Sequence, residues 1–247
     1  MKLKRRLALC QLPAAAGERA ATLTDAVTYP GPLNDLALAA TWHAAWSSLG
    51  VLAPAGLREE LMAAWSQPHR SYHDVRHLGE CLALWTHWRH HSPRPGEVAV
   101  ALWFHDAVCE PQSNSSELQS AAWAARSLVS AGVDSDTAQR VHDLVMATAH
   151  ISLQATASGL SANPDAQLLL DIDLSILGSP PERFERYDQD VRKEYVAVTG
   201  ARYQAARAQV LQGFLDRPKI LQGEQAAALL EAQAGINLNA ALSRLAQ

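Results

Sequence analysis

The apolar residues of this chain recur at intervals of three and four along most of its length, and short polar or proline-containing segments separate the periodic stretches. This spacing gathers apolar side chains on one face of an α-helix. Alternating runs of Val, Ile and Thr, which would indicate β-strands, are nearly absent. The pattern therefore predicts an all-α fold, a bundle of roughly eight to ten helices.

Prolines, glycines and small polar residues divide this pattern into candidate helices. Clear breaks fall at Pro68, Gly132 and Pro180-Pro181, because proline removes a backbone donor and glycine favours turns. The predicted helices cover residues 33–49, 56–66, 74–91, 96–107, 116–131, 134–150, 165–177, 181–199, 201–215 and 223–245. Neither an internal repeat nor a long linker interrupts them, so we expect residues 33–247 to form one domain.

The first residues have a different character. A basic start is followed by a short apolar stretch, as in a secretion signal, but Gln11 and Pro13 cut that stretch below the usual length of such a signal. We therefore expect residues 1–32 to be a disordered extension that ends near the turn-forming segment at Pro30.

Composition narrows the function classes. Apolar residues make up 48% of the chain, charged residues 19%, and the net charge is -4, which excludes extended disorder, a membrane span and a basic nucleic-acid footprint. The cysteines Cys10, Cys81 and Cys109 show no CxxC spacing and are typical of reduced thiols. These features predict a cytoplasmic protein with a small-molecule partner, no nucleic acid and no membrane, and they leave a homodimer open.

The dipeptide His105-Asp106 is the first candidate for chemistry. It ends the apolar run from Val98 to Phe104, where a buried carboxylate is costly unless a cation neutralises it. Near a helix end, a histidine nitrogen and the next residue's carboxylate oxygen can converge on one ion. The alternative is a polar helix end in which His105 complements the helix dipole.

Two further pairs have the same kind of side chains. His73 and His77 are four residues apart, so they share one helix face and suit a metal or a metal with substrate. Asp171 and Asp173 lie among aliphatic residues with no basic residue nearby, so their burial requires a counter-charge. Asp171 is the more easily explained as a helix cap.

Two isolated residues stay open between a chemical and a structural role. His150 ends an apolar helix, and Glu117 begins another. A single histidine after an apolar stretch is often a packed or capping residue, and glutamate is favourable in a first helical turn.

In chain order, His77, His105-Asp106 and Asp173 resemble the H...HD...D signature of the HD-domain superfamily of metal-dependent phosphohydrolases. Further segments of the chain are similar to an uncharacterised bacterial family of predicted phosphohydrolases in that superfamily. These segments are Tyr72-His73, Trp103–Val108, Glu117, Ser120-Ala121, Ala147-Thr148, Asp171–Gly178, Arg192, Glu194-Tyr195 and Asn237-Leu238. The resemblance covers residues 33–245 and implies an HD-domain-like helical bundle.

The resemblance also implies roles for individual residues. The implied ligands of a divalent ion are His77, His105, Asp106 and Asp173. The ion can be Mn, Mg, Co, Ni, Zn or Fe. Asp106, His73, His150 and Glu117 are the implied catalytic group. Arg192, Glu194, Tyr195 and His73 are the implied substrate contacts.

These residues predict a hydrolase of a small phosphoester, such as a nucleotide, that acts through a metal-activated water. Two alternatives stay open. The first is an HD-type oxygenase in which His73 and His150 help to bind a second iron. The second is a helical module that binds a nucleotide without turning it over.

Overall fold

The computed structural model describes residues 29–111, 113–149 and 163–246. These ranges contain ten α-helices, two 3-10 helices and no strand, so the all-α prediction is confirmed. The helices are α1 (Asp35–Ser48), α2 (Leu57–Trp65), α3 (Val75–Trp88), η1 (Arg89–His91), α4 (Pro95–Phe104), α5 (Ser116–Ser130), α6 (Ser135–Thr148), α8 (Pro164–Asp173), η2 (Leu174–Gly178), α9 (Pro181–Glu194), α10 (Gly200–Leu215) and α11 (Glu224–Leu245). None of these helices is long and apolar enough to cross a membrane.

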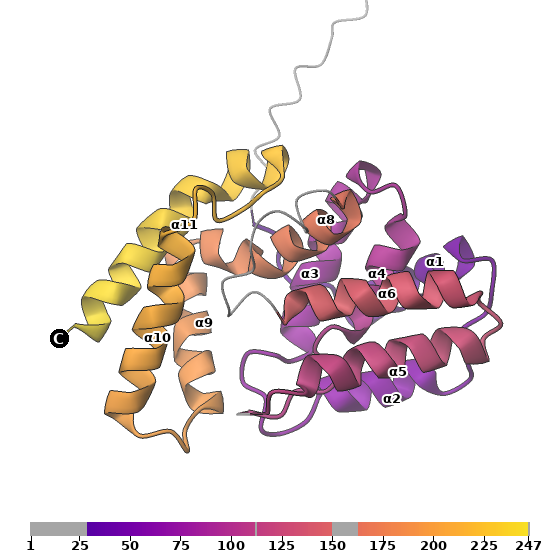
Figure 1. The fold of residues 1–247 in the computed structure, drawn as a ribbon, viewed down its shortest axis with the longest axis horizontal. Helices are drawn as coiled ribbons and strands as arrows, with labels where there is room; N and C mark the ends of the chain where they lie inside the picture. The colour runs from indigo at the N-terminus through magenta and orange to yellow at the C-terminus, as the bar shows by residue number, and fades with distance from the viewer. Residues whose placement is uncertain (1–28, 112, 150–162, 247) are drawn as a thin grey trace, which may run out of the picture.

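Helix α4 is the centre of the fold. Every residue from Gly96 to Phe104 is buried, as expected for a helix that is apolar on all sides. It contacts α1, α3, α5, α6 and α8, and Figure 1 shows it enclosed by its neighbours while α5 and α6 run side by side. The residues that follow Phe104 therefore leave α4 inside the molecule.

The last three helices form a group on one side of the molecule (Figure 1). Helix α11 packs against η2 and α10. The side-chain amide of Asn237 on α11 donates hydrogen bonds of 2.8 Å to the carbonyls of Leu177 and Ser179. These bonds fix the turn between η2 and α9, and with it the direction in which α9 leaves the core.

Four helices end at least three residues earlier than the sequence predicts. Helix α3 ends at Trp88 instead of residue 91, and the chain continues as the 3-10 helix η1. Helix α4 ends at Phe104 instead of residue 107, and α9 ends at Glu194 instead of residue 199. Helix α8 ends at Asp173, and the chain continues as the 3-10 helix η2. Arginine side chains explain two of these ends: Arg70 binds the carbonyls of residues 106 and 107, and Arg192 binds those of residues 195 and 198. Side-chain donors thus replace the backbone bonds of another helical turn.

Two glycine-to-alanine changes test the contact between η2 and α11. A Cβ on Gly178 would meet the Cβ and carbonyl oxygen of Leu230 at 2.5 Å, so we expect Gly178→Ala to lower the free energy of unfolding by about 1–3 kcal/mol. Gly213 on α10 has nothing within 4 Å of that position, so Gly213→Ala is expected to raise it by about 0.5–1 kcal/mol. Urea unfolding followed by circular dichroism measures both, and equal effects would contradict this packing.

Candidate metal centre

Four donor atoms meet where α3, α4 and α8 come together. His77 Nε2 lies 3.2 Å from His105 Nε2 and 3.2 Å from Asp173 Oδ1. Asp106 Oδ2 lies 3.2 Å from His105 Nε2 and 3.9 Å from His77 Nε2. The remaining measured separation, from His105 Nε2 to Asp173 Oδ1, is 3.5 Å. The structure thus brings together residues that are almost 100 positions apart in the sequence.

These separations fit the donors of one metal ion. Two donors that each lie about 2.1 Å from an ion are roughly 3.0 Å apart at a right angle and roughly 3.4 Å apart at the tetrahedral angle. The observed separations of 3.2 to 3.9 Å lie around these values. Two imidazole nitrogens and two carboxylate oxygens suit first-row divalent cations.

The hydrogen bond of His105 leaves its Nε2 atom available as a metal ligand. Its Nδ1 lies 2.8 Å from the carbonyl oxygen of Leu102, and because a carbonyl only accepts, Nδ1 carries the proton. In the neutral ring the lone pair is therefore on Nε2, the atom that faces the other three donors. Such a bond behind a ligating histidine is the usual way in which proteins fix its tautomer and orientation.

The end of α4 is held by Arg70, which precedes α3. Its guanidinium donates to the carbonyls of His73 at 2.9 Å, Asp106 at 2.7 Å and Ala107 at 2.9 Å. The indole of Trp65 donates to the carbonyl of Trp103 at 3.0 Å and its ring packs against that of His105. Arg70 and Trp65 together set the position of His105-Asp106.

His77 lies in the first turn of α3. The carboxylate of Asp74 caps this helix by accepting hydrogen bonds from the backbone N–H groups of Arg76 and His77. The ring of Tyr72 packs on the imidazole of His77, with 4.7 Å between ring centroids. The cap and the aromatic contact leave His77 little freedom to turn away from the other donors.

One side of this cluster is open. The side chains of His77 and His105 are only 2% and 1% exposed, whereas those of Asp106 and Asp173 are 22% and 16% exposed. The imidazoles therefore form the floor, and the carboxylates lie at the opening. Catalytic metal sites keep such an open position for water or substrate, and structural sites are closed.

The charges of the cluster are balanced by histidine alone. Burial would raise the pKa of Asp106, but His105 outweighs this effect and holds the pKa well below its usual range. Burial would likewise lower the pKa of His105, but Asp106 raises it well above the usual value. Within the described part of the chain, neither Asp106 nor Asp173 forms an ion pair with Lys or Arg. A bound cation would therefore supply the missing counter-charge directly and compete with protons for the imidazoles.

Cys81, which no motif indicated, is the neighbour of this cluster on α3. Donor atoms of His77, Cys81, His105 and Asp173 all lie within 4.8 Å of one another. The sulfur is 3.7 Å from Nδ1 and 3.8 Å from Nε2 of His77. These nearly equal distances place it beside the imidazole ring and away from the Nε2 lone pair. We therefore assign the donor set to His77, His105, Asp106 and Asp173.

His73 lies next to the cluster and is anchored by Glu194. Its Nδ1 is 2.7 Å from Glu194 Oε2, while Glu194 Oε1 accepts the backbone N–H groups of residues 71, 72 and 73 at 2.8 to 3.0 Å. Burial would lower the pKa of His73, but hydrogen bonds that include Cys109 and Glu194 raise it well above its usual value. His73 thus favours the protonated form, and its ring lies 6.0 Å from that of His77.

The predicted substrate contacts separate into two groups. His73 and Tyr195 line a cavity of about 650 Å³ between α9, α10 and the loop before α5. Glu194 is buried with its carboxylate fully engaged, and the guanidinium of Arg192 donates to the carbonyls of Tyr195 and Val198. Glu194 and Arg192 therefore position the walls of the site, and a direct substrate contact by either one stays a prediction.

The two remaining catalytic predictions have less support. Glu117 lies in the first turn of α5, where it acts on the pKa of Tyr195 and makes no hydrogen bond or ion pair with the described residues. His150 lies outside the residues that the structure describes, and its predicted role stays a prediction.

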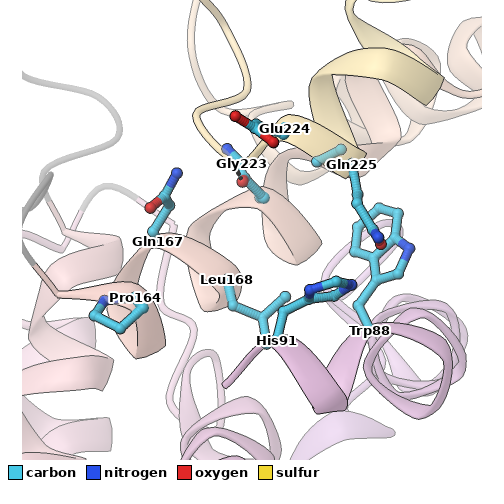
Figure 2. A pocket seen from close by; sticks show the side chains of 10 residues that line it. Trp88, His91, Pro164, Gln167, Leu168, Gly223, Glu224 and Gln225 are labelled. Carbon is cyan, nitrogen blue, oxygen red and sulfur yellow. Dashed lines mark hydrogen bonds between the residues drawn. The ribbon is translucent and has the colours of Figure 1, made fainter. Parts of the chain in front are cut away.

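Asp171 belongs to a different part of the molecule. Its carboxylate accepts the backbone N–H groups of Gln222 at 2.8 Å and Gly223 at 2.6 Å, and burial raises its pKa to about 6. Figure 2 shows the hollow of about 350 Å³ beside this contact, bounded by Trp88, His91, Gln167, Leu168, Gly223 and Gln225. Asp171 thus fastens the segment before α11, whereas Asp173 faces the metal ligands.

No protein-family model matches the chain, and neither the curated proteins nor the solved structures contain a match. The class that the fold and the site define is therefore an all-α protein with a candidate metal centre. The resemblance to the HD-domain superfamily stays a prediction.

Removal of single donors tests this centre. We expect Asp106→Ala to weaken binding of Mn²⁺ or Zn²⁺ by at least about 100-fold, because even the loss of a residue behind a ligand costs about 10- to 100-fold. Cys81→Ser is the matched control and should leave the affinity nearly unchanged. Isothermal titration calorimetry measures both, and equal losses in the two variants would contradict the donor set.

Acid titration tests the contact between Glu194 and His73. The pKa of Glu194 is lowered from 4.5 to about 2 by its hydrogen bonds to His73 and the backbone, against the effect of burial, so its carboxylate contributes up to about 3 kcal/mol above pH 4.5. This contribution is lost as the pH falls towards about 2. Glu194→Gln, which keeps an acceptor for the backbone, should be less stable than the wild type at neutral pH, and the difference should shrink below pH 4.5. A difference that does not change with pH in urea unfolding would contradict this contact.

Proposed function

We propose that this protein is a metal-dependent hydrolase of small phosphoesters. The observation that carries the proposal is the convergence of His77, His105, Asp106 and Asp173, with two buried imidazoles and two carboxylates at an open side. A divalent ion held by these residues would lower the pKa of a bound water from about 16 towards 7 and polarise a phosphoryl oxygen.

The chain's own residues supply the other requirements. His73 lies beside the donors and has a raised pKa, so its protonated imidazole can bind a phosphoryl oxygen and offset the negative charge that develops there. Glu194 keeps the ring of His73 in place through its bond to Nδ1. The buried floor of Trp65, Tyr72 and the two ligating histidines excludes water from behind the donors.

The order of the four donors along the chain adds support from sequence. His77, His105-Asp106 and Asp173 resemble the HD-domain signature, and these are the four residues that lie together in space. A chance match to a spaced motif gives no reason for its members to meet at one point.

The oxygenase alternative needs a second iron, for which His73 and His150 are the predicted ligands. Glu194 holds the Nδ1 atom of His73 and leaves Nε2 for a ligand, and His150 lies outside the described residues. The four donors that meet in the described part of the chain account for one ion, so the proposal is made for one ion and metal analysis tests the alternative.

Activity measurements test the proposal. They use a panel of phosphomonoesters, nucleotides and phosphodiesters, each with added Mn²⁺, Zn²⁺, Co²⁺, Ni²⁺, Mg²⁺ or Fe²⁺. We expect Asp106→Ala to lower kcat/KM by at least about 100-fold, because a metal supplies several kcal/mol of transition-state stabilisation. The matched control is Asp143→Asn, which changes an exposed acid on α6 and should keep full activity.

Three results would contradict the proposal. Full activity of Asp106→Ala would show that the metal centre takes no part in the reaction. Two irons per chain with oxygen consumption would favour the oxygenase, and nucleotide binding without turnover of any ester would favour the binding module.

A further inference from the structure

The cavity beside His73 has a chemical character of its own. It measures about 650 Å³, within the range of pockets that hold small organic molecules. Seven of its eleven lining residues are apolar or aromatic. They include Val191, Val198 and Val210 along the hairpin of α9 and α10, which lie side by side in Figure 1. These walls suit an apolar group better than a sugar or a second phosphate.

The one buried cationic group among the described residues of the cavity, Arg207, is engaged already. The guanidinium of Arg207 donates to Asp188 Oδ1 at 3.1 and 3.0 Å and lies over the ring of Tyr187. Its charge is thus neutralised by the protein. A condensed phosphate or a sugar phosphate would need several free donors at this position, and Arg207 is not one of them.

The buried hydroxyl of Tyr203, which lines the cavity, has no hydrogen-bond partner among the described residues. Arg202 and Asn114 are exposed, and neither forms a hydrogen bond or an ion pair there. One free guanidinium and one amide are enough to orient an organic molecule at the cavity mouth, but they do not provide a phosphate-binding site of their own.

His73 joins this cavity to the metal ligands. Its side chain is 28% exposed and lines the cavity, and its ring lies 6.0 Å from that of His77. The cavity therefore begins next to the donors, at a distance that a group attached to a bound phosphoryl can reach past His73.

We infer that the cavity between α9, α10 and His73 holds the leaving group of the substrate, and that this group is an aromatic alcohol. The inference rests on the proposed function. In this assignment Tyr195, Val198 and Val210 contact the ring, and Arg202 lies exposed beside it. The site then favours aryl phosphates over glycerol phosphate or pyrophosphate.

A pair of tryptophan substitutions on α10 tests this assignment. Ala206 is exposed and lines the cavity, whereas its neighbour Ala205 is exposed and does not. Ala206→Trp should fill the cavity without disturbing the core, and Ala205→Trp is the matched control. The wild type should hydrolyse 1-naphthyl phosphate at least about tenfold more efficiently than glycerol phosphate. Ala206→Trp should lower kcat/KM for the naphthyl ester at least about tenfold and leave kcat/KM for glycerol phosphate unchanged, and Ala205→Trp should leave both unchanged.

Calorimetric titration with 1-naphthol, in metal-free protein, separates the cavity from the reaction. If naphthol binds to Ala205→Trp and not to Ala206→Trp, the result supports the apolar cavity. This conclusion holds even if no ester is hydrolysed, in which case only the proposed function fails. Equal hydrolysis of both esters, or naphthol binding that Ala206→Trp does not weaken, would overturn the cavity assignment and leave the proposed function standing.

Discussion

Two carboxylates and two imidazoles share one small volume at the junction of α3, α4 and α8, and the surrounding structure holds them there at an electrostatic cost. Asp106 and Asp173 repel each other, and desolvation disfavours both charges. Without an ion, this cost is offset by the contacts of the carboxylates with the imidazoles of His77 and His105, and these contacts raise the pKa of His105. A divalent cation would offset it with a full double charge and satisfy all four donors at once.

The supporting residues explain how the cluster keeps its shape. The apolar helix α4 carries His105 into the core, the carbonyl of Leu102 fixes its tautomer, and Arg70 ties the next carbonyls to the segment before α3. Glu194 performs a similar task for His73 by gathering three backbone N–H groups. The fold thus surrounds the donors with groups that leave them few other arrangements, which is the condition for a preorganised site.

The pattern of the sequence predicted the all-α fold, and the resemblance named four residues that the structure brings close together. Neither indicated which residues hold them in place. The apolar run from Val98 to Phe104 predicts a buried helix because no face of it is polar. Arg70 carries no such signal, because its partners are backbone carbonyls whose position depends on the fold. The early ends of α4 and α9 have the same cause, since arginine side chains take the place of another helical turn there.

Asp171 and Asp173 show most clearly which contacts the sequence does not predict. Both are acids in one apolar segment, yet residues two apart on a helix point roughly 200° away from each other. Asp173 consequently reaches the histidines, while Asp171 reaches backbone N–H groups about 50 residues further along the chain. The sequence alone shows that each needs a partner and does not show which partner it has.

The most direct test of the central claim is X-ray absorption spectroscopy of the protein loaded with one equivalent of Zn²⁺ or Co²⁺. The donor set predicts a shell of nitrogen and oxygen atoms at about 2.0–2.2 Å with the multiple-scattering signature of two imidazoles. A sulfur shell near 2.3 Å would make Cys81 a ligand, and a spectrum without imidazole scattering would show that His77 and His105 do not bind the ion. Either result would contradict the account.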